Sequence, residues 1–203
     1  ISFIGGGNMA QALIGGLVAR GLAPTRITVS DPVEGVRDLL AEKGVQVTTD
    51  NAAAVLVADV VVFAVKPQVL SQVLKPLHGL CDGKLIVSIV AGAEVATIAN
   101  LLGTERVVRV MPNTPALVQI GAHGLFANEA MNQADRDLAS QILAATGLTI
   151  WVPVESQIDA VTAVSGSGPA YFFYMMESMI RAGKNLGLDE KTATALTLQT
   201  ALG

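Results

Sequence analysis

The chain has 203 residues, of which 51% are hydrophobic, 15% are charged and 4% are aromatic. This composition excludes a disordered chain, because disorder requires low hydrophobicity together with high net charge. Thirteen basic and seventeen acidic residues leave a net charge of −4, and no cluster of lysine and arginine indicates a nucleic-acid partner. No apolar run approaches the roughly 18 residues of a membrane span, so we expect no membrane partner either.

A single cysteine, Cys81, excludes an internal disulfide framework and is typical of a reducing compartment. No charged segment precedes the first apolar run, so we expect no signal peptide and a cytoplasmic protein. The two histidines, His78 and His123, have no potential metal ligand at a recognised spacing. We therefore expect no metal site, and neither a zinc enzyme nor a serine–histidine hydrolase.

Short β-branched runs alternate with helical patterns through the first half of the chain. The runs are Ile1–Ile4, Arg26–Ser30, Val60–Val65, Lys84–Ile89 and Arg106–Met111. The helical patterns are Met9–Arg20, Val33–Lys43, Gln68–Leu77 and Val95–Leu102. Continuous apolar runs bounded by turn residues are typical of strands buried on both faces. The alternation therefore predicts an α/β fold with a Rossmann-like, doubly wound parallel sheet.

The second half begins with the same pattern and then becomes entirely helical. The predicted elements are a strand over Gly124–Ala127, a helix over Gln133–Ala145 and a strand over Leu148–Val152. After Pro153 we expect a helix over Ser156–Val164, a break at Ser165–Pro169, a long helix over Ala170–Asn185 closed by Gly187, and a last helix from Asp189 to about Leu202. We predict a dinucleotide-binding domain over residues 1–152 and a helical domain over residues 153–203.

The first predicted strand runs directly into Gly5-Gly6-Gly7-Asn8-Met9-Ala10, which opens a helix. This is a G-x-G-x-x-A pattern, in which Gly5 permits a tight turn, Gly7 admits a pyrophosphate and small Ala10 lets the helix pack closely. The free N–H groups at the start of that helix stabilise phosphates. A glycine turn can also be no more than a tight connection, but its place in a βαβ unit favours a dinucleotide cofactor.

The second predicted strand ends in Ser30-Asp31-Pro32. A carboxylate at this place accepts hydrogen bonds from the ribose 2′-hydroxyl of NADH and repels the 2′-phosphate of NADPH. Asp31 therefore favours NADH. The alternative is that Asp31-Pro32 only starts a turn before the next helix.

Three further strand ends carry candidate ligand groups. Val65-Lys66-Pro67 places a lysine where ligands bind in open α/β sheets, although it can also be an ordinary solvated lysine. The small residues around Ala91 let a cofactor lie against the backbone. Met111-Pro112-Asn113-Thr114-Pro115 presents Asn113 rigidly, as the carboxamide of nicotinamide requires.

Ser165-Gly166-Ser167-Gly168-Pro169-Ala170 directly precedes the long helix. Successive N–H groups at a helix start attract anions, and the two hydroxyl groups add further donors. The alternative is a flexible break between two helices.

Taken together, these motifs resemble those of the pyrroline-5-carboxylate reductase family. The stretches that carry the resemblance are Phe3–Ala10, Ala64–Pro67, Arg109–Pro115 and Ser165–Tyr171, and they follow the family's order along essentially the whole chain. The resemblance implies hydride transfer from NAD(P)H to the C=N carbon of Δ1-pyrroline-5-carboxylate, which gives L-proline in the last step of proline biosynthesis. It also implies that NADPH is favoured, in conflict with Asp31.

The resemblance further implies a helical domain that interlocks with a second copy, giving a homodimer or a higher homo-oligomer. The composition independently favours association, because the helix over Ala170–Ile180 is apolar around most of its circumference and must be buried. The family continues past the position of Gly203 into further helices, including a loop that binds the substrate carboxylate. Either this is therefore a truncated copy or its substrate pocket is incomplete.

Motifs and resemblance together predict two groups of site residues. The predicted cofactor-binding residues are Gly5, Gly7, Asn8, Met9, Ala10, Gln11, Ser30, Asp31, Asn51, Val65, Lys66, Pro67, Ala91 and Asn113. The predicted catalytic-site residues are Ser165, Gly166, Ser167, Gly168 and Glu155, the last of which matches a family position that contacts the substrate.

A site without histidine or metal suits this reaction, because a protonated imine is already electrophilic and needs mainly positioning and electrostatic stabilisation. Two alternatives remain open at this point. One is a Rossmann reductase of the β-hydroxyacid dehydrogenase type, although its catalytic lysine has no counterpart within Ala170–Ile180. The other is a nucleotide-binding module without turnover.

Overall fold

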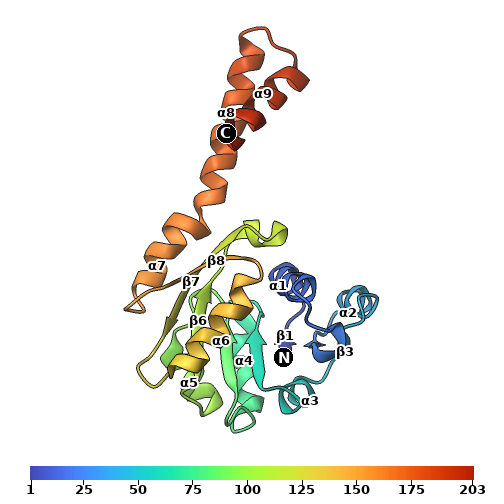
Figure 1. Ribbon diagram of the computed structural model, residues 1–203, viewed down its shortest axis with the longest axis vertical. Helices are drawn as coiled ribbons and strands as arrows, with labels where there is room; N and C mark the ends of the chain where they lie inside the picture. Colours follow the sequence, from blue (N-terminus) through green and yellow to red (C-terminus); the bar gives the residue numbers. More distant parts are fainter.

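An eight-stranded sheet covered by helices on both faces forms the centre of the computed structural model, which describes residues 1–203 (Figure 1). The strands are β1 (Ser2–Ile4), β2 (Thr28–Ser30), β3 (Gln46–Thr48), β4 (Val60–Phe63), β5 (Leu85–Ser88), β6 (Val107–Met111), β7 (Gly121–Ala127) and β8 (Gly147–Trp151). The helices are α1 (Asn8–Ala19), α2 (Glu34–Ala41), α3 (Asn51–Leu56), α4 (Leu70–Leu74), α5 (Val95–Leu102), α6 (Gln133–Ala144), α7 (Gln157–Val161), α8 (Gly168–Asn185) and α9 (Glu190–Leu202).

The strand order is β3-β2-β1-β4-β5-β6-β7-β8. The first six strands are parallel and have the order of a doubly wound dinucleotide-binding sheet. Strand β7 then pairs antiparallel with β6 and parallel with β8. The predicted α/β class and the Rossmann-like sheet are confirmed.

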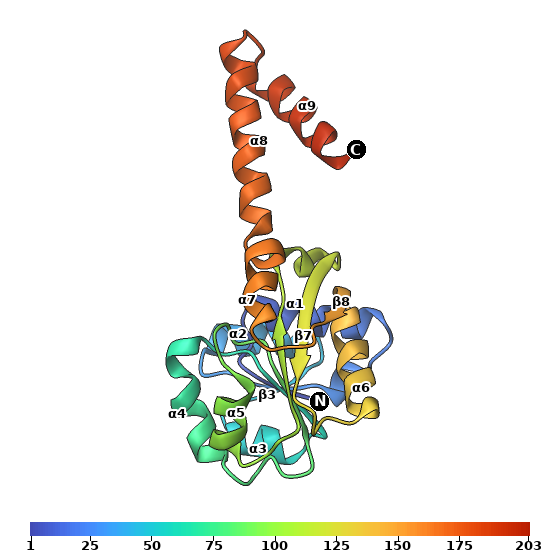
Figure 2. The same ribbon diagram turned by 90° about the vertical axis from the view of Figure 1, so that its left-hand side faces the viewer.

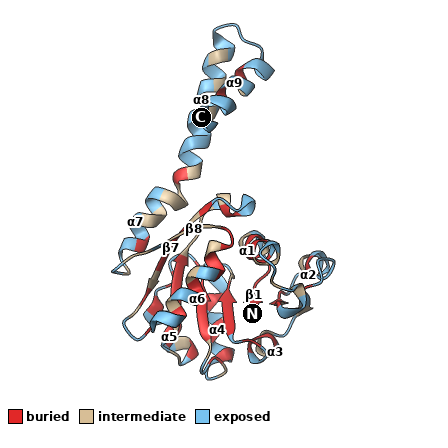
Figure 3. Cartoon of the chain, in the orientation of Figure 1, coloured by how far each residue is buried: buried red, intermediate tan, exposed pale blue.

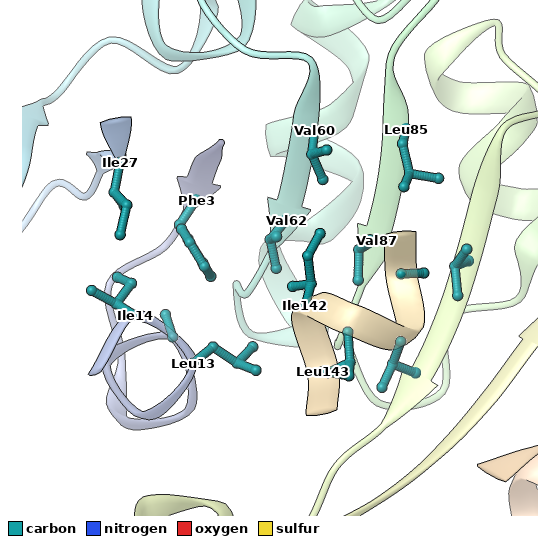
Figure 4. Packing of buried hydrophobic residues seen from close by; sticks show 14 of the residues in the cluster. Phe3, Leu13, Ile14, Ile27, Val60, Val62, Leu85, Val87, Ile142 and Leu143 are labelled. Atoms are coloured by element: carbon teal, nitrogen blue, oxygen red, sulfur yellow. The ribbon is translucent and has the colours of Figure 1, made fainter. Parts of the chain in front are cut away.

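The two faces of the sheet bury separate hydrophobic clusters, because successive side chains of a strand point to opposite faces. Phe3 belongs to a cluster of 20 buried residues beneath α1 and α6, which Figure 4 shows around Leu13 and Leu143. The neighbouring Ile4 belongs to a cluster of 18 buried residues on the face covered by α3, α4 and α5. Burial on both faces explains why these strands are runs of valine and isoleucine.

Helices α8 and α9 extend away from the sheet as an arm, with α9 folding back beside α8 (Figures 1 and 2). Figure 3 shows that the arm is mostly exposed, whereas the interior of the sheet is buried. Phe172, Tyr174 and Met175 are each more than 60% exposed in the single chain. This is the surface that the sequence predicts to need a partner. No helix combines the length and the apolar character that crossing a bilayer requires.

The predicted break at Ser165–Pro169 is wrong. Helix α7 continues through a π-helix over Thr162–Gly166, and α8 begins two residues later at Gly168. Pro169 does not interrupt the helix, because it lies in the first turn of α8, where its missing N–H has no partner to lose. The connection between sheet and arm is therefore helical almost throughout.

Other local predictions need smaller corrections. The expected helix over Gln68–Leu77 consists of α4 between two short 3-10 helices, because Pro67 and Pro76 each remove a backbone donor. Strand β3 and helix α3 were not predicted at all, since one is a three-residue, partly polar strand and the other is a single short helix. The last strand ends at Trp151 and only helices follow, but the domain boundary after residue 152 stays a prediction.

His123 on β7 is almost completely buried, and its environment determines its protonation state. Its Nε2 lies 2.9 Å from Oγ1 of Thr146, which itself donates to the carbonyl oxygen of Leu143 at 3.1 Å. Because that hydroxyl has already donated its proton, Nε2 must be the donor, and buried Nδ1 has no partner. Burial lowers the pKa of His123 below its ordinary value of 6.5.

We predict that His123 makes the protein less stable as the pH falls below this ordinary value. In that range the unfolded chain binds a proton on His123 that the folded protein excludes, so acid favours unfolding. Urea unfolding at about pH 7.5 and about pH 5.5 measures the effect. His123→Gln should reduce the loss of stability on acidification, whereas His78→Gln, at an exposed position, should leave it unchanged. Equal pH dependence in all three proteins would contradict the prediction.

Candidate functional site

The carboxyl ends of β1, β4 and β5 meet at one edge of the sheet, and the loops and helix starts that follow them carry most of the predicted cofactor residues. In the first of these loops Gly5 has a φ of +98°, and a Cβ there would lie 2.7 Å from the carbonyl oxygen of Ala64. Only glycine fits this conformation. The turn leads directly into α1, where buried Ala10 packs into the core.

The start of α1 is open to a ligand. No side chain caps this helix, so the N–H groups of its first turn are available. Gly7, the residue before α1, is exposed, and a Cβ built on it meets nothing within 4 Å. Gln11 holds the loop in shape by donating from Nε2 to the carbonyl oxygen of Gly6 at 2.8 Å. Free donors facing open space fit the pyrophosphate of a dinucleotide.

The ends of β2 and β4 border the same edge. Ser30 donates from Oγ to Oδ1 of Asn51 at 2.6 Å, so these two predicted residues lie together. Asp31 behaves differently, because its Oδ2 accepts from the N–H of Gly6 at 2.7 Å and thus supports the glycine loop from beneath. Beyond β4, the half-buried Val65 leads to exposed Lys66, which takes part in none of the chain's four ion pairs.

The remaining predicted cofactor residues have simple surroundings. Asn8, Pro67 and Ala91 are exposed, and Met9 is half-buried. All lie in the loops, or at the helix starts, that follow β1, β4 and β5. Their contacts with a cofactor stay predictions.

Asn113 links the sheet to the base of the arm. Its Nδ2 donates to the carbonyl oxygen of Ser165 at 3.0 Å, and its Oδ1 accepts from the N–H of Ala122 at 2.8 Å. The structure therefore brings together two motifs that lie about fifty residues apart in the sequence. Both ends of the amide contact protein, so Asn113 holds the Ser165–Gly168 segment in place.

A cavity of about 310 Å³ opens beside this link. Its lining residues come from the loop after β6, the π-helix and the first turns of α8, and they are Asn113, Pro115, Val164, Ser165, Gly168, Pro169, Phe172 and Phe173. Helix α8 has no side-chain cap, and because Pro169 has no N–H and Ala170 donates to the carbonyl oxygen of Ser167 at 3.0 Å, the N–H of Gly168 is the donor left at this helix start. The arrangement suits a small anion with an apolar body.

Arg109 is the site residue that the sequence analysis missed. Its side chain is only 7% exposed, and its Nη1 lies 3.0 Å from Oε1 of Glu155. The same oxygen of Glu155 accepts from the N–H of Val95 at 2.8 Å, at the start of α5. Asp159 on α7 lies 3.7 Å from Nη2 of Arg109 and is itself exposed. A charged residue inside a valine-rich strand was the signal available in the sequence.

Comparisons with known proteins agree with this geometry. Residues 1–92 match the family described as NADP oxidoreductase, coenzyme F420-dependent, and residues 155–203 match the family described as pyrroline-5-carboxylate reductase dimerisation. A pyrroline-5-carboxylate reductase of Pseudomonas aeruginosa is 52% identical over the whole chain, which spans 76% of that relative. The chain belongs to the pyrroline-5-carboxylate reductase family.

Solved structures of family members support the same assignment. A pyrroline-5-carboxylate reductase from Coxiella burnetii matches the whole chain, and 76% of its own, with a TM-score of 0.95 and 45% identity. The Plasmodium falciparum reductase with NADP bound matches 98% of the chain, and 74% of its own, with a TM-score of 0.87 and 30% identity. The predicted family is confirmed, while the individual site residues stay predictions.

We predict that Gly7→Val abolishes dinucleotide binding and leaves the fold intact. The backbone of Gly7, at φ −65° and ψ −179°, is accessible to any residue, and a side chain there meets no protein atom. A branched side chain would occupy the space of the pyrophosphate instead. Fluorescence titration with NADPH and NADH measures the loss. Gly15→Val, at an exposed position on the same helix, should bind normally, and normal binding by a folded Gly7→Val would contradict the prediction.

We predict that Glu155→Gln destabilises the protein by about 1 to 3 kcal/mol, because it leaves buried Arg109 with only the exposed and more distant Asp159 as a charged partner. Asp159→Asn should cost less than about 1 kcal/mol, since Asp159 is exposed and more distant. Urea unfolding compares the two variants with the unmodified chain. Equal effects would show that Glu155 does not support the arginine.

Proposed function

We propose that the protein reduces Δ1-pyrroline-5-carboxylate to L-proline with NAD(P)H, through the residues gathered at this sheet edge. The observation that carries the proposal is the 52% identity to a pyrroline-5-carboxylate reductase over the whole chain. The open turn at Gly7 and the cavity beside Ser165 are its structural support, because they provide separate places for a dinucleotide and a small acid.

A nicotinamide bound along the glycine loop supplies a hydride for the C=N carbon of the imine. The chain's own residues bind the cofactor and the substrate and orient them toward each other. We propose that the N–H groups at the start of α1 hold the pyrophosphate, and that the N–H of Gly168 at the start of α8 helps to orient the substrate. Phe172 and Val164 give the cavity apolar lining, and because both are exposed in the single chain, we propose that a second copy covers them and excludes water.

The groups at the base of the arm act by positioning in this proposal. Asn113 fixes the carbonyl of Ser165, and the hydroxyl of Ser165 donates to the carbonyl oxygen of Val161 at 3.0 Å. Glu155, predicted to contact the substrate, is held by Arg109 and the N–H of Val95. We propose that Glu155 orients the loop before α5, which carries Ala91, and does not transfer a proton.

An assay of purified protein with Δ1-pyrroline-5-carboxylate and each reduced cofactor tests the proposal. We expect oxidation of the cofactor that depends on the imine, with formation of proline. Dinucleotide binding without turnover would favour a nucleotide-binding module instead. Turnover of a β-hydroxyacid and not of the imine would favour the other Rossmann reductases.

The match to the dimerisation family indicates a homo-oligomer. We further propose that the exposed apolar face of α8 packs against the same helix of a second copy, about a two-fold axis. The exposed aromatic side chains of α8 support this, because a monomer leaves them in water.

We propose the reducing cytoplasm as the compartment of this protein. The buried thiol of Cys81, whose pKa burial raises to about 11, fits that compartment.

We predict that Tyr174→Glu shifts the protein to monomers, because it places a charge in the centre of the proposed interface. Tyr174 is 69% exposed in the single chain. Light scattering at micromolar concentration measures the mass. Val57→Glu, at an equally exposed apolar position after α3, is the control and should remain oligomeric. A fully oligomeric Tyr174→Glu would move the interface elsewhere.

A further inference from the structure

Two residues of opposite charge, Asp31 and Arg37, lie at the carboxyl end of β2. The carboxylate of Asp31 is turned into the protein: Oδ2 accepts from the N–H of Gly6 at 2.7 Å, and Oδ1 accepts from the N–H of Val33 at 2.8 Å. The residue is only 9% exposed. Both of its oxygens therefore serve the backbone, one in the glycine loop and one in the turn before α2.

Arg37, on α2, is oriented by the same turn. Its Nη1 donates to the main-chain oxygen of Asp31 at 2.8 Å, and the side chain is half-exposed. This is the only hydrogen bond of its side chain, and none of the chain's four ion pairs includes it. Neither of its acidic neighbours on α2, Glu34 and Asp38, forms an ion pair with it. The guanidinium is thus an anchored cation with free donors.

The end of the second strand is the place where a dinucleotide-binding sheet contacts the adenosine ribose. NADPH carries a phosphate on the 2′-oxygen of that ribose and NADH carries a hydroxyl. A guanidinium matches a phosphate with parallel, charge-assisted hydrogen bonds. Asn51 adds a neutral donor nearby, because Ser30 donates to its Oδ1 and leaves its Nδ2 without a protein partner.

We propose that Arg37 binds the 2′-phosphate and makes NADPH the preferred cofactor, while Asp31 supports the glycine loop for either cofactor. The proposal rests on the proposed function only in requiring that the glycine loop binds a dinucleotide. It reverses the expectation that Asp31 favours NADH. That expectation assumes a carboxylate facing the ribose, whereas here the N–H of Gly6 holds it inward.

Titration of the full chain with NADPH and NADH, without substrate, tests the proposal. We expect the unmodified protein to bind NADPH at least about tenfold more tightly, and Arg37→Gln to lose about ten- to a hundredfold in NADPH affinity. NADH affinity should change far less. Arg37→Lys should recover part of the NADPH affinity, because it restores the charge without the planar geometry. Added salt should reduce the advantage of NADPH, because the site is partly exposed.

Two controls separate this role from a general effect of charge or folding. Arg20→Gln removes the same charge at the end of α1, next to the amino end of the sheet, and should leave the ratio of the two affinities unchanged. Asp31→Asn should change the affinities for the two cofactors by the same factor, whether they fall or stay as they are. Adenosine 2′,5′-bisphosphate should compete better than adenosine 5′-monophosphate in the unmodified protein, and about equally well in Arg37→Gln.

The proposal would be overturned if Arg37→Gln lost affinity for NADPH and NADH equally. It would also be overturned if Asp31→Asn gained affinity for NADPH alone. If both cofactors bind and no variant changes their ratio, the assignment of Arg37 fails and the proposed function stands. If the unmodified protein binds neither cofactor, the dinucleotide site itself fails.

Discussion

The ion pair between buried Arg109 and half-buried Glu155 is the interaction on which the arrangement of the site depends. A charge in the interior of a valine-rich strand is costly unless it is paired and hydrogen-bonded. Glu155 meets this requirement from the segment that leads to the arm, and it also accepts from Val95 at the start of α5. One carboxylate thus joins the sheet, the loop after β5 and the first helix beyond the sheet.

The amide of Asn113 makes a second connection between the same parts, since it bonds to both β7 and the π-helix. With both connections in place, the cavity beside Ser165 has walls from the loop after β6 and from the base of the arm in one fixed relation. This fits a reaction whose main requirement is orientation, because an electrophilic imine needs a correctly placed donor more than an acid or a nucleophile.

Local signals explain which parts of the structure could be predicted from the sequence. Helix α5 has the predicted limits, because Gly103 takes a left-handed conformation after it, and Asp189 caps α9 as expected. The π-helix was missed because a glycine- and proline-containing segment reads as a break. The roles of Arg109 and Asp31 were missed for a different reason: each depends on which way a side chain turns toward residues far away in the sequence, and no local pattern records that.

The helical connection between sheet and arm has a mechanical consequence. Because α8 has eighteen residues, it is a rod of about 27 Å, and a tilt of roughly 10° at its base moves its far end by about 5 Å. The converse also holds. When the far end of α8 is fixed, the base of the helix has almost no freedom to tilt. If a second copy packs against the arm as proposed, it also stiffens the cavity at the base of the arm, and association becomes a means of tuning the geometry of the site.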